Sequence, residues 1–173
     1  LENGALEKGG FVADNVSIAY STTMGLKKVA KTNYVSPNAQ ICQHAMIEDH
    51  AVIEGDAYIE GFAFIGGHAW VGEKAYIAGN ARVEGQAQIS GQAQILEEAV
   101  VRDMAQVKGE AIIYGHAHIY ENATVEDGAR IFGSAKVYGH ATVKDSAQVF
   151  AAAKAYGESY ISEFASICEE AKV

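Results

Sequence analysis

The sequence is poor in positive charge and in long apolar runs, and each shortage excludes a class of protein. Lys and Arg number 13 against 22 Asp and Glu, which gives a formal net charge of -9. Binding to a nucleic-acid backbone needs clustered Lys and Arg, so nucleic acid is not expected as a partner. No apolar run reaches the roughly 18 residues of a membrane span, and no secretion signal is visible at the N-terminus. We therefore expect no membrane partner, and a cytoplasmic protein or a component of a larger assembly.

A six-residue repeat dominates the rest of the sequence. From Val35 to Val173, Ile or Val recurs at every sixth position except at Ala155, and an alanine follows four residues later except at Ser159. The 23 hexads contain no insertion. Their third and fourth positions are rich in Gly, Asp, Asn, Glu and His. Because Ala is smaller than Ile, the coil at Ala155 is expected to be thinner unless its neighbours fill the space.

Hexapeptide periodicity is typical of a parallel β-helix, in which short strands stack coil on coil. The alanine at position five and the aliphatic residue that follows it are two residues apart, so both point inward from one strand. Positions six and two point outward. Positions three and four form the corners, where Gly, Asn and Asp tolerate the left-handed backbone conformation of a tight turn. The pattern therefore predicts an all-β solenoid with a core of Ile, Val and Ala.

The array resembles the left-handed parallel β-helix of the hexapeptide-repeat superfamily, which implies three hexads in each triangular coil. More closely, it is similar to the YdcK-like repeat proteins of bacteria and phages, which carry an acyltransferase label. Such proteins begin with a Gly-Gly-Trp/Phe segment before the repeats, and the similar segment here is Gly9-Gly10-Phe11-Val12 followed by Asn15, Val16 and Ser17. The resemblance covers nearly the whole chain, and it carries no catalytic residues onto this sequence.

The repeat divides the chain into two parts. Residues 1–34 are expected to form an N-terminal cap and a degenerate first coil, and residues 35–173 the regular β-helix. Val12, Val16 and Ile18 resemble an irregular hexad, after which the register fails before Val35. A cap is expected because the end of a β-helix presents unpaired backbone groups. The array runs to Val173, so we expect the C-terminal edge to continue into further chain or to dock onto another chain or copy.

Three hexads per coil place residues that are 18 apart in columns, roughly 4.8 Å apart along the solenoid. Cys42 and Cys168 are seven coils apart, or roughly 34 Å. A disulfide needs Cα atoms within about 7 Å, so the two cysteines cannot be bridged within one chain. This favours a reduced, intracellular protein, and an end-to-end link between copies is the alternative.

Two outward columns contain large apolar side chains in their C-terminal halves. The first column includes Leu96, Tyr114, Phe132 and Phe150, and the second includes Tyr120, Tyr138 and Tyr156. Aligned apolar side chains on an outer face favour a partner-binding surface. Stacking that stabilises neighbouring strands is the alternative. We expect a homo-oligomer or a protein partner.

Histidines are the candidates for metal chemistry. His50 and His68 are 18 residues apart and are expected to stack at one corner with Asp49 nearby, which makes them a candidate metal pair. Two ligands do not complete a zinc site, so the sequence predicts no complete metal site.

Catalysis has its own histidine candidates. Acyltransferases of the superfamily use a histidine as general base in a cleft between subunits. If the chain is such an enzyme, His116 and His118 are the candidates, beside Tyr114 and Tyr120.

Two functions from different classes remain open. The first is a structural or interaction module, a rigid spacer without a cofactor that self-associates or docks partners through the aromatic columns and the C-terminal edge, in a larger bacterial or phage assembly. The second is an acyltransferase that uses acyl-CoA at a trimer interface. The unbroken array favours the first, because it offers neither an extruded loop nor an interior cavity.

Overall fold

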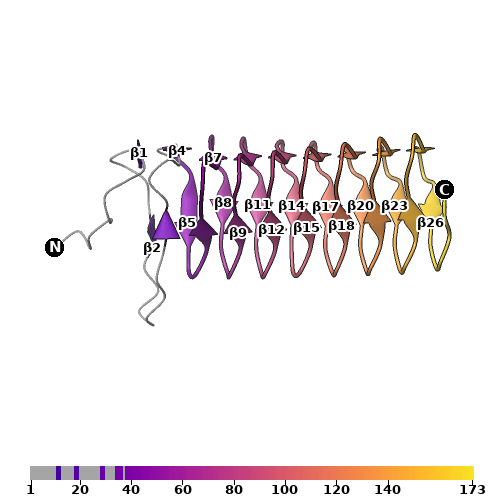
Figure 1. Ribbon diagram of the computed structural model, residues 1–173, viewed down its shortest axis with the longest axis horizontal. Coiled ribbons are helices and arrows are strands. Elements are labelled where there is room, and N and C mark those ends of the chain that lie inside the picture. Colours follow the sequence, from indigo (N-terminus) through magenta and orange to yellow (C-terminus); the bar gives the residue numbers. More distant parts are fainter. Residues whose placement is uncertain (1–10, 13–17, 20–27, 30–33, 37) are drawn as a thin grey trace.

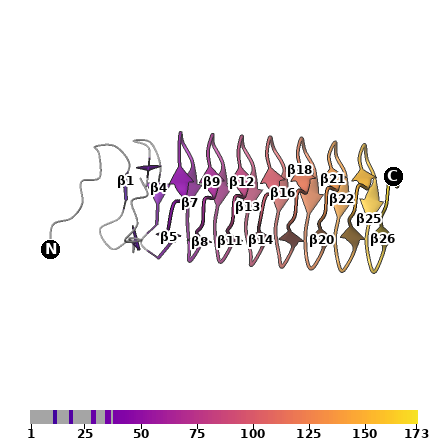
Figure 2. The ribbon, with the colours of Figure 1, turned by 90° about the horizontal axis from the view of Figure 1, so that it is seen from below.

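The computed structural model describes residues 11–12, 18–19, 28–29, 34–36 and 38–173. This part of the chain is all-β, and its short strands form three parallel sheets along a straight rod (Figure 1). Successive coils follow one another along the rod, as a second view at 90° also shows (Figure 2). No helix in the described ranges is long and apolar enough to cross a lipid bilayer.

Each coil contributes one strand to each sheet. Sheet A contains β1 (Phe11–Val12), β4 (Tyr34–Val35), β7 (Val52–Ile53), β10 (Trp70–Val71), β13 (Gln88–Ile89), β16 (Gln106–Val107), β19 (Thr124–Val125), β22 (Thr142–Val143) and β25 (Tyr160–Ile161). Sheet B contains β2 (Ile18–Ala19), β5 (Gln40–Cys42), β8 (Tyr58–Ile59), β11 (Tyr76–Ile77), β14 (Gln94–Ile95), β17 (Ile112–Ile113), β20 (Arg130–Ile131), β23 (Gln148–Val149) and β26 (Ser166–Ile167). Sheet C contains β3 (Lys28–Val29), β6 (Met46–Ile47), β9 (Phe64–Ile65), β12 (Arg82–Val83), β15 (Val100–Val101), β18 (His118–Ile119), β21 (Lys136–Val137) and β24 (Lys154–Ala155).

Every strand from β1 to β23 pairs in parallel with the strand three further along the chain. From β4 onward the strands begin every six residues, and Trp70, for example, lies opposite Gln88. Three sheets and three strands per turn make a triangular coil, so the predicted all-β parallel β-helix is confirmed. The left-handed sense of the coil stays a prediction.

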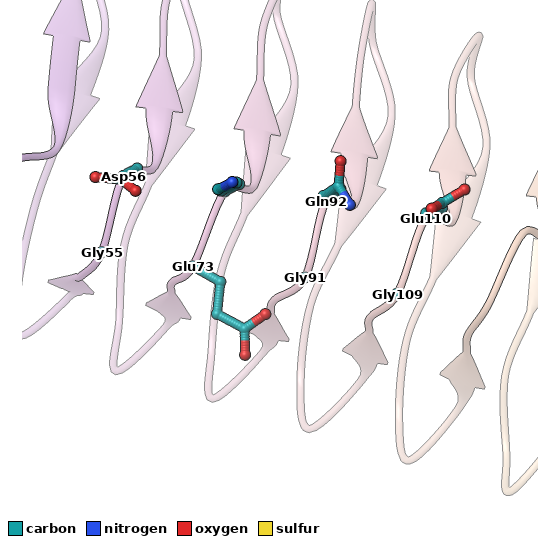
Figure 3. A pocket seen from close by; sticks show the side chains of 8 residues that line it. Gly55, Asp56, Glu73, Gly91, Gln92, Gly109 and Glu110 are labelled. Atoms are coloured by element: carbon teal, nitrogen blue, oxygen red, sulfur yellow. The ribbon is translucent and has the colours of Figure 1, made fainter.

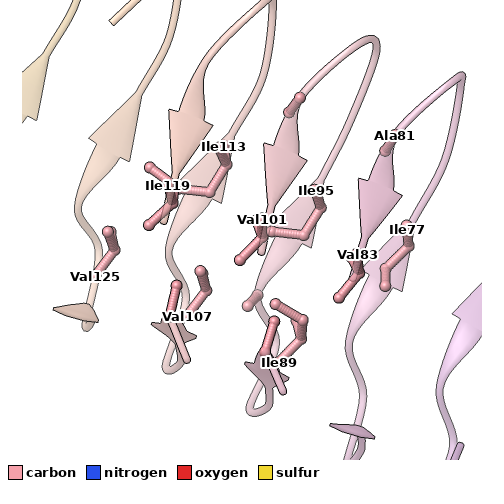
Figure 4. Packing of buried hydrophobic residues seen from close by; sticks show 14 of the residues in the cluster. Ile77, Ala81, Val83, Ile89, Ile95, Val101, Val107, Ile113, Ile119 and Val125 are labelled. Carbon is pink, nitrogen blue, oxygen red and sulfur yellow. The ribbon is translucent and has the colours of Figure 1, made fainter. Parts of the chain in front are cut away.

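The core is a column of aliphatic side chains inside the triangle. The alanine that precedes each strand and the Ile or Val at the strand's second residue have no exposed surface over most of the array. Figure 4 shows Ile77, Ile95 and Ile113 in successive coils of sheet B, all directed into the interior. Because each coil repeats the same inward pair, neighbouring coils fill the same cross-section and the interior is sealed.

The corners adopt the left-handed backbone that the third position predicts. Eleven glycines and eleven other residues have positive φ there, and Asp103, for example, has φ 61°. Carboxylates at this position also accept a hydrogen bond from the backbone N–H of the residue 18 further along. Five corners are linked in this way: Asp49 to Gly67 (3.0 Å), Glu97 to Gly115 (2.9 Å), Asp103 to Glu121 (3.1 Å), Glu121 to Gly139 (2.8 Å) and Asp145 to Glu163 (2.9 Å). The carboxylates therefore connect coils at N–H groups that the backbone hydrogen bonds leave unpaired.

The first coil joins the array through three short strands. Val12 lies opposite Val35, Ile18 opposite Ile41, and Val29 opposite Ile47. The six-residue repeat is therefore interrupted between Ile18 and Val29, because these two strand residues are more than six residues apart. Most of the predicted cap, including Asn15, Val16 and Ser17, lies outside the described residues, so the boundary after residue 34 stays a prediction.

Two core positions depart from the repeat near the C-terminal end. Ala155 has no exposed surface and lies opposite Val137, so the smaller side chain leaves the strand register unchanged. Ser159 replaces an alanine, and its buried hydroxyl oxygen has no hydrogen-bond partner in the structure.

Candidate functional site

The outward surface of sheet B carries the first aromatic column. We call this surface face B: the outward residue of each sheet B strand and the residue that follows the strand. The rings of Tyr114 and Phe132 are parallel to within 6°, with centroids 4.9 Å apart, and those of Phe132 and Phe150 to within 3° at the same distance. Leu96 precedes them in the same column, and all four side chains are partly exposed. The predicted alignment is therefore present, and the partner role of these residues stays a prediction.

The outward surface of sheet C carries the second column. We call it face C, defined in the same way. The rings of Tyr120 and Tyr138 have centroids 4.9 Å apart and an interplanar angle of 4°, and Tyr156 extends the stack at 5.4 Å. The guanidinium carbon of Arg102 lies 4.9 Å from the centroid of the Tyr120 ring, so a cation covers the first ring of the stack.

Stacking limits what a partner could contact in both columns. Aromatic pairs ordinarily favour offset or edge-to-face geometry. Here the coil spacing imposes face-to-face stacking, so each inner ring covers the face of the next. A partner can therefore reach ring edges and hydroxyl groups but few ring faces. Ring stacking between coils is expected to stabilise neighbouring strands, and the ring edges are left available for contact.

His116 and His118 occupy two different surfaces. His116 is exposed at the corner between sheets B and C, and its Nδ1 lies 3.1 Å from Glu98 Oε2 of the previous coil. His118 is partly buried on β18. Burial, and then the charges of Lys136, Arg102 and His116, lower the pKa of His118 below its usual value of 6.5, so its imidazole is neutral at pH 7. The structure records no hydrogen bond from either histidine to Tyr114 or Tyr120.

The structure brings the candidate metal ligands His50 and His68 together but, among the residues it describes, places no third ligand with them. The rings of His50 and His68 stack with centroids 4.8 Å apart and an interplanar angle of 22°. Asp49, the expected neighbour, accepts a hydrogen bond from the Gly67 N–H instead. Within the described ranges, no group of three or more His, Cys, Asp or Glu side chains could hold a metal ion.

A hydrogen-bonded cluster on the N-terminal half of face B was missed by the sequence analysis. The Tyr76 hydroxyl donates to Glu60 Oε1, and Tyr58 donates to Glu60 Oε2 at 3.3 Å. The Glu60 carboxylate raises the pKa of Tyr76 to about 12, and the Cys42 side chain is the main reason why the pKa of Tyr58 also rises to about 12. Both tyrosines stay protonated at neutral pH, so neither presents a phenolate nucleophile. Reading the sixth and second hexad positions together would have revealed it.

A shallow groove of about 460 Å³ follows the corner between sheets A and B (Figure 3). Its lining residues are Gly55, Asp56, Glu73, Lys74, Gly91, Gln92, Gly109 and Glu110. The glycines leave the corner open, and the charged side chains carry opposite signs. None of the six histidines lines the groove, so it contains no acid and base pair of the kind that acyl transfer uses.

A comparison with protein-family models, with curated proteins and with solved structures found no match to this chain. The parallel β-solenoid rests on the structure itself, and membership of the YdcK-like proteins stays an expectation.

Proposed function

We propose that this chain is a rigid structural module, a YdcK-like hexapeptide-repeat spacer, that self-associates by packing face B against face B of a second copy. The rod supplies length and stiffness, and the outer face supplies the contact. No cofactor takes part in this role. A larger bacterial or phage assembly is the setting that the resemblance suggests.

The regularity of the rod supports a structural role. From β5 to β26, every coil has three strands in one register and no inserted loop. The interior is filled by side chains without exposed surface, so it offers no room for a substrate. Such a scaffold resists bending, because each strand from β4 to β23 is hydrogen-bonded to the coils on both sides.

The apolar column of face B carries the proposal. The residues that follow the sheet B strands, from Ala78 to Cys168, include no charged residue, although one fifth of the chain is charged. Arg130, which is exposed on β20 beside Phe132, is the one charged outward residue of face B in this stretch. Leu96, Tyr114, Phe132 and Phe150 are partly exposed in successive coils, with Ile112 beside them. A continuous apolar strip on a polar surface is characteristic of a protein contact. Two copies related by a twofold axis would bury the strip on both sides.

The C-terminal edge of the rod, formed by β25, β26 and residues 171–173, is a second surface through which the module would dock. Among the described strands, none pairs with the far side of β25 or β26, whereas Lys172 already forms a β-bridge to Lys154 of β24. The nearby side chains of Tyr160 and Phe164 are 63% and 87% exposed. A further coil or a strand of another chain would satisfy the backbone groups of this edge.

Sedimentation velocity over a concentration series tests self-association through face B. We expect the wild type to form a species larger than the 18.4 kDa monomer. Phe132→Lys places a charge in the centre of the strip and should return the protein to the monomer. Thr142→Lys introduces the same charge on sheet A and should leave the mass unchanged. A wild type that stays monomeric, or equal effects of the two variants, would overturn the proposal.

The lowered pKa of His118 favours a second candidate function, the acyl-CoA-dependent acyltransferase at a trimer interface. A general base must be unprotonated to accept a proton, and His118 meets this requirement at pH 7. The neighbouring His116, paired with Glu98, would be the second histidine of such a site. Acetyl-CoA binding that is lost in His118→Ala and retained in His140→Ala would support this function. No binding up to ~1 mM would exclude it as a working enzyme.

A further inference from the structure

Face C carries a column of basic side chains alongside its tyrosines. His118, Lys136 and Lys154 lie opposite one another on β18, β21 and β24, and Lys172 forms a β-bridge to Lys154. Position six of the repeat therefore places a basic side chain in each of four successive coils. The tyrosine stack runs parallel to this column on the same face.

The lysines of this column are not neutralised by the protein. Within the part of the chain that the structure describes, neither Lys136 nor Lys154 forms an ion pair. On sheet A, by contrast, Lys108 pairs with Glu126 of the next coil at 2.8 Å. Like charges on directly opposed strand positions destabilise a sheet. The repulsion between these lysines would be relieved by an anion supplied from outside.

Carboxylates are absent from the outward positions of face C in the C-terminal half. The last one is Glu84, which forms an ion pair with Arg82. At the two flanking corners, Glu98 pairs with His116, and Glu121 accepts a hydrogen bond from the Gly139 N–H. Glu158, Glu169 and Glu170 are exposed at these corners and form no ion pair with the lysines. Face C is thus a basic strip on a chain whose formal net charge is -9.

The geometry of the strip defines the ligand that fits. Its charges repeat at the coil spacing of roughly 4.8 Å along a flat sheet. Single-stranded nucleic acid binds proteins through bases stacked on aromatic faces. The Tyr138 ring lies between the rings of Tyr120 and Tyr156, so its faces are not available to a base. The tyrosine edges and hydroxyls can instead contact the rim and hydroxyl groups of a sugar.

We propose that face C binds a linear anionic polysaccharide lengthwise, with one carboxylate-bearing sugar per coil. Each carboxylate lies on the column formed by Lys136, Lys154 and Lys172, and the sugar hydroxyls contact the tyrosine stack. The rise per sugar of an extended uronic acid chain is of the same order as the coil spacing of roughly 4.8 Å, so its carboxylates recur along the rod on the same scale as the lysines. This binding is independent of self-association through face B.

Calorimetry with a short polygalacturonate at low salt tests the proposal. We expect binding that weakens as salt is added, because the contacts are ionic. Lys136→Gln/Lys154→Gln should weaken binding at least tenfold. The matched control Lys108→Gln/Lys144→Gln removes the same charge from the residues beside sheet A and should leave the affinity unchanged. A neutral oligosaccharide of equal length should not bind.

His118 offers a local readout of the same event. A bound carboxylate should raise the pKa of His118, which proton NMR can measure with and without the polysaccharide. The signals of His44, on a distant coil, should not change when the polysaccharide is added. The double variants should both keep the wild-type thermal unfolding profile or improve on it, since the substitutions are on outward positions. Failure to bind polygalacturonate, equal binding of oligothymidylate, or equal weakening by both double variants would each overturn the proposal.

Discussion

The Glu97 carboxylate accepts a hydrogen bond from the backbone N–H of Gly115, one coil further along, over 2.9 Å. Glu97 itself has φ 60°, a conformation that non-glycine residues adopt at a cost. The link between coils therefore offsets local backbone strain. It gives a reason why acidic residues, as well as glycine, occupy the third position at the corners.

Substitutions at Glu97 should separate the two effects. Glu97→Ala loses the hydrogen bond and keeps the strain, so we expect the free energy of unfolding to fall by about 1 kcal/mol. Glu97→Gly also loses the hydrogen bond, but glycine adopts positive φ freely, so its loss should be smaller. Denaturant unfolding measures both, with Glu110→Ala at another corner as the control. Equal stabilities of Glu97→Ala and Glu110→Ala would contradict the role of the link.

The buried hydroxyl of Ser159 should reduce the stability of the last coils. A buried polar group without a partner typically costs about 1–3 kcal/mol. Ser159→Ala restores the residue type found at this position in the other hexads and should raise the melting temperature. Ser134→Ala, at an exposed corner, should leave it unchanged. A lower melting temperature for Ser159→Ala would show that the hydroxyl has a partner in solution.

The tyrosines of the Glu60 cluster should lose their protons at a higher pH than ordinary tyrosines. Tyr76 has a pKa of about 12 because its hydroxyl donates to the Glu60 carboxylate. Since this value lies above the usual ~10 of the unfolded chain, the associated stability is present below pH ~10 and is lost as pH rises through about 12. Glu60→Gln removes the negative charge and should lower the pKa of Tyr76 towards ~10. Ultraviolet titration shows the change, and Tyr76→Phe assigns it. An unchanged titration in Glu60→Gln would refute the assignment.

His118 should make the fold sensitive to mild acid. Burial is the main cause of its lowered pKa, and Lys136 is the next. As pH falls through ~6.5 the unfolded chain takes up the proton first, so the stability tied to neutral His118 is full above that pH and decreases below it. Lys136→Gln should raise the pKa of His118, as measured by NMR, and reduce the acid sensitivity. Lys108→Gln should do neither. A normal His118 pKa in the wild type would contradict the effect of burial.

Much of this architecture follows from the sequence because all regular coils have the same length. Residues that are 18 apart in the sequence contact each other in neighbouring coils. This period correctly predicted that His50 stacks on His68 and Phe132 on Phe150. The inward positions were equally clear, since the aliphatic residues and alanines of the repeat are the core that the structure contains. The period fails only in the first coil, where the spacing between Ile18 and Val29 is irregular.

Features that depend on two columns at once were harder to predict. Glu60 is at the second hexad position, whereas its partners Tyr58 and Tyr76 are at the sixth. An inspection of one column of residues at a time therefore does not show that they are in contact. The basic strip of face C was hidden by the net charge, which averages over the three faces and the corners. Acidic corner residues also had two explanations, turn preference and coil linkage, and the side-chain geometry was needed to establish the second.

Small-angle X-ray scattering of the assembled wild type tests the central proposal most directly. Packing through face B places two rods side by side, so we expect a larger cross-sectional radius of gyration than in Phe132→Lys, with an unchanged rod length. A cross-section equal to that of Phe132→Lys, whether the rod is longer or the same, would contradict association through face B. A longer rod of unchanged cross-section would assign the contact to the C-terminal edge formed by β25, β26 and residues 171–173.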